Sequence, residues 1–290
     1  MSPHLSARTR KIILGVIILA AVGMITIVPI SSFKLVNPIV TNQQARIEKF
    51  TAEGNPKAPL LTLTTWLVSF FYPFWGTMSF IGGVVLLIIA KDLYQGKPWA
   101  RGLALLCLAV PSMGGAYMIV PWMNFVGSKQ GGFPPAFLTM LIGLIPYFTL
   151  LLADRGDLKQ KGIDFLVFLM LGVSAAENFA NGHAAFRILY GHPKRPLFAE
   201  GIGVTFFTWL GLWFAFALLT AAIYQLGNRK ISGWYLAVSG GAIAFLISGI
   251  THYFRHATLD YLYGSLMGLS IVVMLLIPVF KERILTPYSK

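Results

Sequence analysis

Long uninterrupted apolar runs are the feature that most constrains the fold of this chain. Each run has about the 20 residues that a helix needs to cross the hydrocarbon layer of a bilayer. Strands of a membrane barrel would instead alternate between apolar and polar residues over about ten positions. The runs therefore predict an all-α integral membrane protein, a polytopic bundle of about eight transmembrane helices. They lie near 12 to 33, 60 to 90, 100 to 125, 134 to 153, 163 to 189, 202 to 226, 231 to 254 and 262 to 280.

The composition agrees with a membrane protein. Of the 290 residues 56% are hydrophobic and 11% are charged, which is too apolar for a soluble domain to cover with polar surface. A net charge of +13 would suggest nucleic-acid binding in a soluble protein. Here the basic residues fall in short connections between apolar runs, where they set membrane orientation. We therefore exclude nucleic acid as a partner and expect a multi-pass protein of the cell membrane, surrounded by the lipid bilayer.

The distribution of basic residues predicts the orientation. If the N-terminus lies inside, 14 of the 23 Lys and Arg residues fall on inner segments and 9 on outer ones. This bias places both termini in the cytoplasm, and an even number of helices agrees with it.

No connection is long enough to form a second folded unit, so residues 1–290 are expected to form a single transmembrane helical domain. The largest connection is the outer loop 34–59. Within it, the stretch from Thr41 to Gly54 predicts a short amphipathic helix with Ile47 and Phe50 on one face.

Three successive runs carry a proline near their middles, at Pro73, Pro111 and Pro146. Proline removes a backbone hydrogen bond, so each run is expected to kink. Transporters use such breaks to line cavities, although proline is also common in membrane helices generally.

Polar residues gather in two segments, 174–192 and 251–260. They hold four of the five histidines and Glu177, an acidic residue deep within an apolar run. An ionisable group in that position is costly and marks a functional site by default. In the predicted topology both segments reach the outer face of the membrane, so we expect them to form one site.

Helical geometry groups these residues into faces. Glu177 and Asn181 are four residues apart, as are His252 and His256, so each pair shares one face of its helix. Asp260 continues the histidine face only if that helix extends so far. His183 can join Glu177 only if the helix loosens at 181–182.

Histidines that face a carboxylate suit several kinds of chemistry. They could bind a transition metal such as Zn, Cu or Fe, or a b-type haem with His183 or His192 opposite a histidine of the 231–254 helix. Without a metal, Glu177 and His252 could handle protons, as catalytic groups or in transport. The predicted metal ligands are His252, His256, Glu177, Asn181 and His183.

Three functions fit these observations. The first is metal- or haem-dependent oxidoreduction, or a related reaction, on a lipid-soluble substrate in the outer half of the bilayer. The second is transport of a small solute or a proton-coupled substrate. The third is a non-catalytic anchor that binds other membrane or peripheral subunits of a complex.

Overall fold

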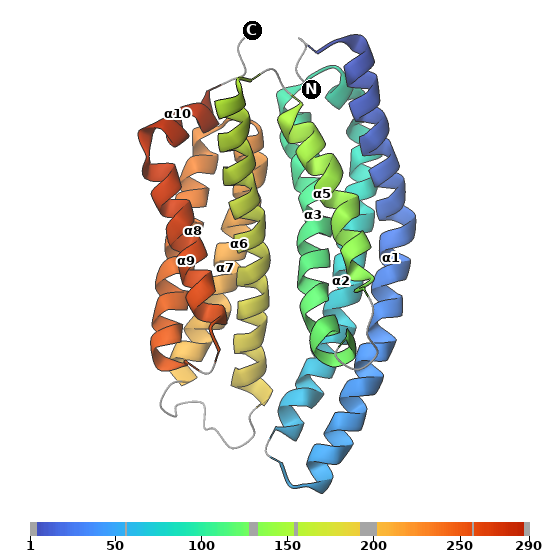
Figure 1. Ribbon diagram of the computed structural model, residues 1–290, viewed down its shortest axis with the longest axis vertical. Coiled ribbons are helices and arrows are strands. Elements are labelled where there is room, and N and C mark those ends of the chain that lie inside the picture. Colours follow the sequence, from blue (N-terminus) through green and yellow to red (C-terminus); the bar gives the residue numbers. More distant parts are fainter. Residues whose placement is uncertain are drawn as a thin grey trace.

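The computed structural model describes residues 5–55, 57–127, 133–153, 156–191, 202–256 and 258–286, and all regular structure in them is helical. Both ends of the described chain lie at the same end of the bundle, which we call the termini end (Figure 1). The opposite end, where α1 turns into α2, is the hairpin end. The helices are α1 (Ala7–Ala52), α2 (Ala58–Tyr94), α3 (Pro98–Trp122), the π-helix η1 (Met123–Gly127), α5 (Ala136–Leu152), α6 (Leu158–Gly191), α7 (Ile202–Gly227), α8 (Ile231–Phe254), α9 (Asp260–Leu276) and α10 (Pro278–Leu285).

Six helices in the described part are long and apolar enough to cross a membrane, namely α1, α2, α3 with η1, α6, α7 and α8. A seventh span results if α9 and α10, which meet at 79°, are taken together. Helix α5 has 17 residues and rises about 26 Å, a little less than the hydrocarbon thickness of about 30 Å. Large apolar side chains such as Leu19, Ile88 and Phe207 are exposed on the outside, as a lipid-facing surface requires. The membrane architecture is thus supported with six or seven spans, and the count of eight stays a prediction.

The segment expected to be an outer loop is helical. Helix α1 continues without interruption from Ala7 to Ala52, so the short amphipathic helix predicted from Thr41 is its last part and not a separate element. The chain turns after Ala52 at Gly54, whose φ of +63° is accessible to glycine without strain, and α2 begins at Ala58. Packing explains the difference, because α1 and α2 stay in contact along their lengths and bury Leu35 and Ile39 beyond the apolar run.

The prolines do not interrupt their helices. Pro73, Pro111 and Pro146 lie inside α2, α3 and α5, which are each continuous. The predicted helix boundary at the chain's end shifts as well. The run 262–280 forms α9 up to Leu276, and Pro278 starts α10 after a sharp bend, because proline cannot continue the preceding hydrogen-bond ladder.

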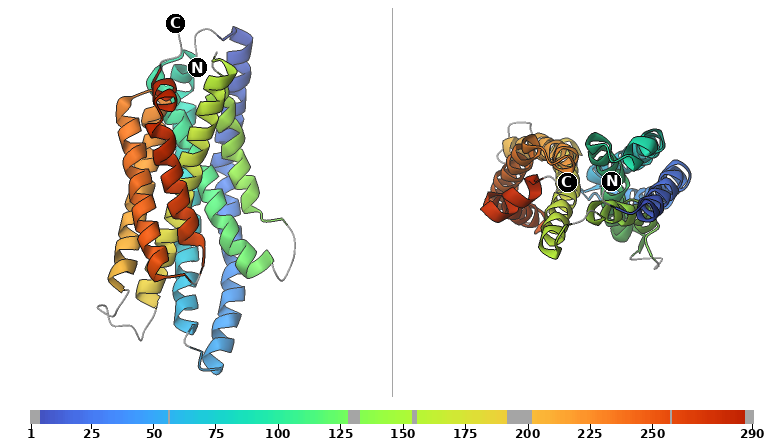
Figure 2. Two further views of the ribbon diagram at one scale, coloured as in Figure 1. Left: turned by 60° about the vertical axis from the view of Figure 1, so that its left-hand side comes forward. Right: turned by 90° about the horizontal axis from the view of Figure 1, so that it is seen from above.

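The helices form two lobes (Figures 1 and 2). The first lobe contains α1, α2, α3 and α5, and the second contains α6, α7, α8 and α9. The two lobes meet where α2, α3 and α5 face α6 and where α3 faces α7. In the view from the termini end the lobes stand side by side (Figure 2, right).

At the termini end polar contacts join the two lobes. Arg101 on α3 donates hydrogen bonds to the carbonyl of Gly227 at 2.8 Å and to that of Leu151 at 3.3 Å, which lie at the ends of α7 and α5. The backbone N–H of Gly102 donates to Asn228 Oδ1 at 3.1 Å. The guanidinium thus satisfies helix-end carbonyls that have no partner within their own helices.

Candidate functional site

Glu177 and Asn181 lie one turn apart on α6, on the face that their spacing predicts. Asn181 Nδ2 donates to Glu177 Oε1 at 3.1 Å and lies 3.2 Å from the carbonyl oxygen of Asp260 at the start of α9. Among the described residues Glu177 forms no ion pair with a basic side chain. The carboxyl group therefore has a neutral hydrogen-bond donor and no cation beside it.

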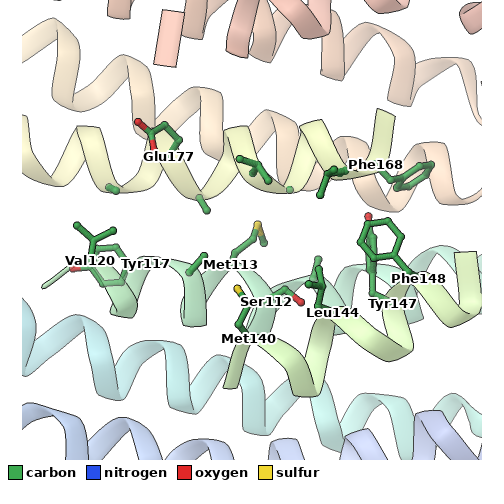
Figure 3. Close-up of a pocket in the computed structure, with 17 residues that line it drawn as sticks. Ser112, Met113, Tyr117, Val120, Met140, Leu144, Tyr147, Phe148, Phe168 and Glu177 are labelled. Atoms are coloured by element: carbon green, nitrogen blue, oxygen red, sulfur yellow. The ribbon is translucent and has the colours of Figure 1, made fainter. Parts of the chain in front are cut away.

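Glu177 also lines a cavity of about 240 Å³ between the lobes, formed by α3, α5 and α6 and open on one side. Its walls are mainly aliphatic, aromatic and methionine side chains, with Met113, Met140 and Phe148 among them. Glu177 lies beside Tyr117 and Val120 towards one end, whereas Tyr147, Phe148 and Phe168 lie at the other (Figure 3). A water molecule takes about 30 Å³ in the liquid, so the cavity has room for a small organic molecule.

Few polar groups interrupt this apolar wall, and one of them is unsatisfied. The Tyr147 hydroxyl is buried and has no hydrogen-bond partner in the described structure. Ser112, by contrast, donates to the carbonyl of Leu108 at 3.0 Å within its own helix. A buried hydroxyl without a partner costs free energy, and a bound molecule with a polar group would offset that cost.

Two of the histidines predicted to join Glu177 lie at the end of α8. His252 lies in the last turn of α8, and His256 lies just beyond the helix, where its Nδ1 is 3.0 Å from the carbonyl oxygen of His252. Their rings are 6.2 Å apart and nearly perpendicular, and the His256 side chain is exposed. Helix α8 ends at Phe254, so Asp260 does not continue the histidine face and starts α9 instead.

Helices α6 and α8 both pack against α7 and α9, so they occupy opposite positions in the second lobe. Their facing sides approach each other at Gly264 of α9, where an added Cβ atom would lie 3.1 Å from Ser248 Oγ and 3.2 Å from Asn181 Nδ2. Within the ranges that the structure describes, no group of three His, Cys, Asp or Glu side chains is placed to hold a metal ion. The predicted metal set of His252, His256, Glu177, Asn181 and His183 is therefore not supported by the geometry.

His183 occupies a different surface of α6 from Glu177. The helix runs unbroken through Asn181 and Gly182, so the loosening that would bring the two together does not occur. His183 Nδ1 shares a hydrogen bond of 3.0 Å with the Tyr117 hydroxyl, and its ring contacts Phe71 with centroids 4.2 Å apart. His183 is thus held in an aromatic contact, and His192 lies outside the described residues, so the predicted haem arrangement stays a prediction.

Two further polar features were absent from the expectations. Tyr147 follows Pro146 in an apolar run, and no sequence signal distinguishes its hydroxyl from those of other tyrosines. Asp164 and Arg229 form a buried ion pair at the termini end, with Arg229 Nη2 2.6 Å from Asp164 Oδ2. An acidic residue in the second turn of a membrane run, together with basic residues in an inner connection, could have indicated this pair.

No protein-family model, no curated protein and no solved structure matches this chain. The function has to be argued from the geometry of the molecule alone.

Proposed function

We propose that this protein is a membrane carrier for a small lipid-soluble molecule that bears a positive charge or a hydrogen-bond donor. The observation that carries the proposal is the cavity between the lobes, with its apolar wall, Glu177 among its lining residues and the unpartnered Tyr147 hydroxyl in the described structure. Ligand sites of small molecules are mostly apolar with a few polar groups that fix orientation. This cavity has that composition.

Glu177 supplies the charge chemistry in this proposal. A carboxylate inside a membrane protein is costly without a positive partner, and Glu177 has only the Asn181 amide as a hydrogen-bond donor. Either a proton or a cationic solute can neutralise the Glu177 carboxylate. Binding of one weakens binding of the other, because both need the same negative charge. Competition between the two then couples solute binding to proton release, which is the basis of proton-coupled exchange.

The position of the carboxyl group favours such exchange. Glu177 lines the cavity, yet its carboxyl group is hydrogen-bonded to Asn181, which also contacts the start of α9. A change of side-chain rotamer moves the group between this contact and the cavity. The two lobes supply the larger movement, because the cavity lies where they meet and carriers alternate access by rocking one bundle against another.

The other two functions have less support. Oxidoreduction at a metal depended on a cluster of His and Glu side chains, and among the described residues no group of three His, Cys, Asp or Glu side chains is placed to hold a metal ion. A role as an anchor subunit rests on no contact or surface that distinguishes it from a carrier.

Transport by purified protein in liposomes tests the proposal. A fluorescent lipophilic quaternary ammonium ion, which cannot cross the bilayer by losing a proton as an amine does, should accumulate in response to a pH gradient. Glu177→Gln should abolish the accumulation because the amide cannot exchange a proton. Glu48→Gln is the matched control. This substitution removes the same charge, and Glu48 is exposed on α1 near the hairpin end. Transport by Glu177→Gln at the wild-type rate would refute the role of Glu177.

A second pair of variants tests the cavity itself. Gly172 lines the cavity, and a Cβ atom there would meet nothing within 4 Å, so Gly172→Leu should fill the space without straining the fold. Gly162 on the same helix has equally free surroundings and is exposed, so Gly162→Leu is the control. We expect amine binding to weaken in the first variant only. Equal binding by both would show that the ligand lies elsewhere.

Tyr147→Phe removes only a hydroxyl that has no partner in the described structure. It should therefore leave the unfolding temperature unchanged or raise it, while binding of an amine that also carries a hydrogen-bonding group weakens by about threefold to tenfold, the value of one neutral hydrogen bond. Tyr235→Phe, on the exposed face of α8, should change neither quantity.

A further inference from the structure

Arg187 is a cation on α6 whose charge has no acidic partner in the described structure. It lies one turn before α6 ends at Gly191, close to the hairpin end of the bundle. Its Nη1 reaches across to the first lobe and lies 3.4 Å from Thr64 Oγ1 on α2. Its Nε is buried without a hydrogen-bond partner, and none of the ion pairs among the described residues includes it.

The groups around Arg187 are hydroxyls, an imidazole and a second cation. Tyr117, Tyr261 and Arg255 lie near enough to interact with it electrostatically. His183, one turn earlier on α6, is 5% exposed. Its Nδ1 is occupied by the Tyr117 hydroxyl, and its Nε2 has no partner. Hydrogen-bonding groups from α2, α3, α6 and α9 thus surround a positive charge, with no carboxylate among its electrostatic neighbours.

This arrangement fits an anion. A half-buried cation without an acidic partner is unfavourable, whereas a guanidinium matches the oxygens of a phosphate group with two parallel hydrogen bonds. The position also fits, because the end of a membrane helix lies at the depth of lipid headgroups. Ten residues separate Arg187 from Glu177, which is a rise of about 15 Å along α6, so this site is distinct from the cavity.

We propose that Arg187 binds a phosphate group at the hairpin end of the contact between the lobes. The Thr64 hydroxyl, which donates to the carbonyl of Leu60 at 2.7 Å in this structure, turns to the phosphate as a second donor. The phosphate group belongs either to the headgroup of an anionic phospholipid or to a soluble phosphate. A bound phosphate neutralises Arg187 and, because Arg187 and Thr64 come from different lobes, links α6 to α2. The proposal is independent of the carrier function, since it uses neither Glu177 nor the cavity.

The test measures the unfolding temperature of the full chain in a non-ionic, phosphate-free detergent. Phosphatidylglycerol is added in one arm and inorganic phosphate in the other, each over a concentration range that yields a Kd. Saturable stabilisation by phosphatidylglycerol alone assigns the site to a lipid headgroup, and saturable stabilisation by inorganic phosphate assigns it to a soluble anion. Either result supports the proposal, and the absence of stabilisation in both arms overturns it.

Substitutions test whether the stabilisation by phosphate or lipid arises at Arg187. Arg187→Gln should weaken binding about tenfold to a hundredfold, the value of one hydrogen bond to a charged group. Lys57→Gln removes the same charge from an exposed position at the same end of the molecule and should bind as the wild type does. Equal Kd values for Arg187→Gln and the wild type would overturn the proposal.

Thr64→Val keeps the shape of the side chain and provides a second variant in case Arg187→Gln does not fold. It should weaken binding by about threefold to tenfold. An unchanged Kd in Thr64→Val would remove Thr64 from the site.

Discussion

Replacing Asp164 by alanine should strongly destabilise this protein. The Asp164 carboxylate receives two hydrogen bonds from Arg229, from Nη1 to Oδ1 at 2.8 Å and from Nη2 to Oδ2 at 2.6 Å. Arg229 Nη1 also donates to the carbonyl of Ile284 at 3.0 Å, so the pair holds α10 against α6 and the turn between α7 and α8. Both side chains are buried. Loss of one partner from a buried pair costs about 3–5 kcal/mol, a large fraction of a typical stability of about 5–15 kcal/mol.

The assay is reversible unfolding in mixed detergent micelles. Asp92→Ala is the control, because Asp92 pairs with Lys97 at a similar distance of 2.6 Å but at the surface, where a pair contributes up to about 1 kcal/mol. The double variant Asp164→Leu with Arg229→Met removes both charges and should recover most of the loss. Methionine leaves the backbone strain at residue 229, where φ is 55°, unchanged.

Two results would refute this reasoning. A loss below about 1 kcal/mol in Asp164→Ala would mean that the pair contributes no more than a surface pair does. A double variant no more stable than the single one would mean that the cost arises from lost packing and not from a stranded charge.

Two further predictions concern stability. Gly268→Ala should cost about 1–3 kcal/mol by overpacking, because a Cβ atom there would lie 2.5 Å from a backbone nitrogen of α8. Gly15→Ala, where a Cβ would meet nothing within 4 Å, should be neutral or stabilising in the same unfolding assay. At the termini end, the N–H of Gln160 and then the guanidinium of Arg283 lower the pKa of Asp157. Its carboxylate therefore stabilises the fold above the ordinary Asp pKa of about 3.9, and this stability is lost as the pH falls through the lowered value. The unfolding temperature of Asp157→Asn should fall less than that of the wild type between pH 6 and pH 3, and an identical fall would contradict the assignment.

The helical membrane architecture was predictable because it depends on a property of each segment alone. A run such as 231–254 is apolar along its whole length, and the structure has a helix with those same bounds. Boundaries were wrong where packing extends a helix beyond its apolar run. Polar residues such as Gln43 are buried in α1 by contact with α2, where Thr65 donates a hydrogen bond to Gln43 Oε1 at 2.9 Å.

The site was less predictable because it depends on which helices are neighbours. The spacing of Glu177 and Asn181 placed both on one face of a single helix, where the structure has a hydrogen bond between them. The same reasoning could not determine that α6 and α8 both pack against α7 and α9, and the pairing of His252 with Glu177 stays a prediction. The cavity is also formed by three helices together. Only their packing buries the Tyr147 hydroxyl and makes it a candidate binding group.

The length of α1 makes it possible to determine which side of the membrane each end of the bundle faces. Its part from Lys34 to Ala52 rises about 28 Å beyond the apolar run of α1, so the turn at Gly54 forms the tip of the hairpin end. A peptide tag inserted at this turn would touch neither the cavity nor the Arg187 site. Antibody labelling of intact cells that carry such a tag would reveal which compartment the hairpin enters, and hence where both termini lie.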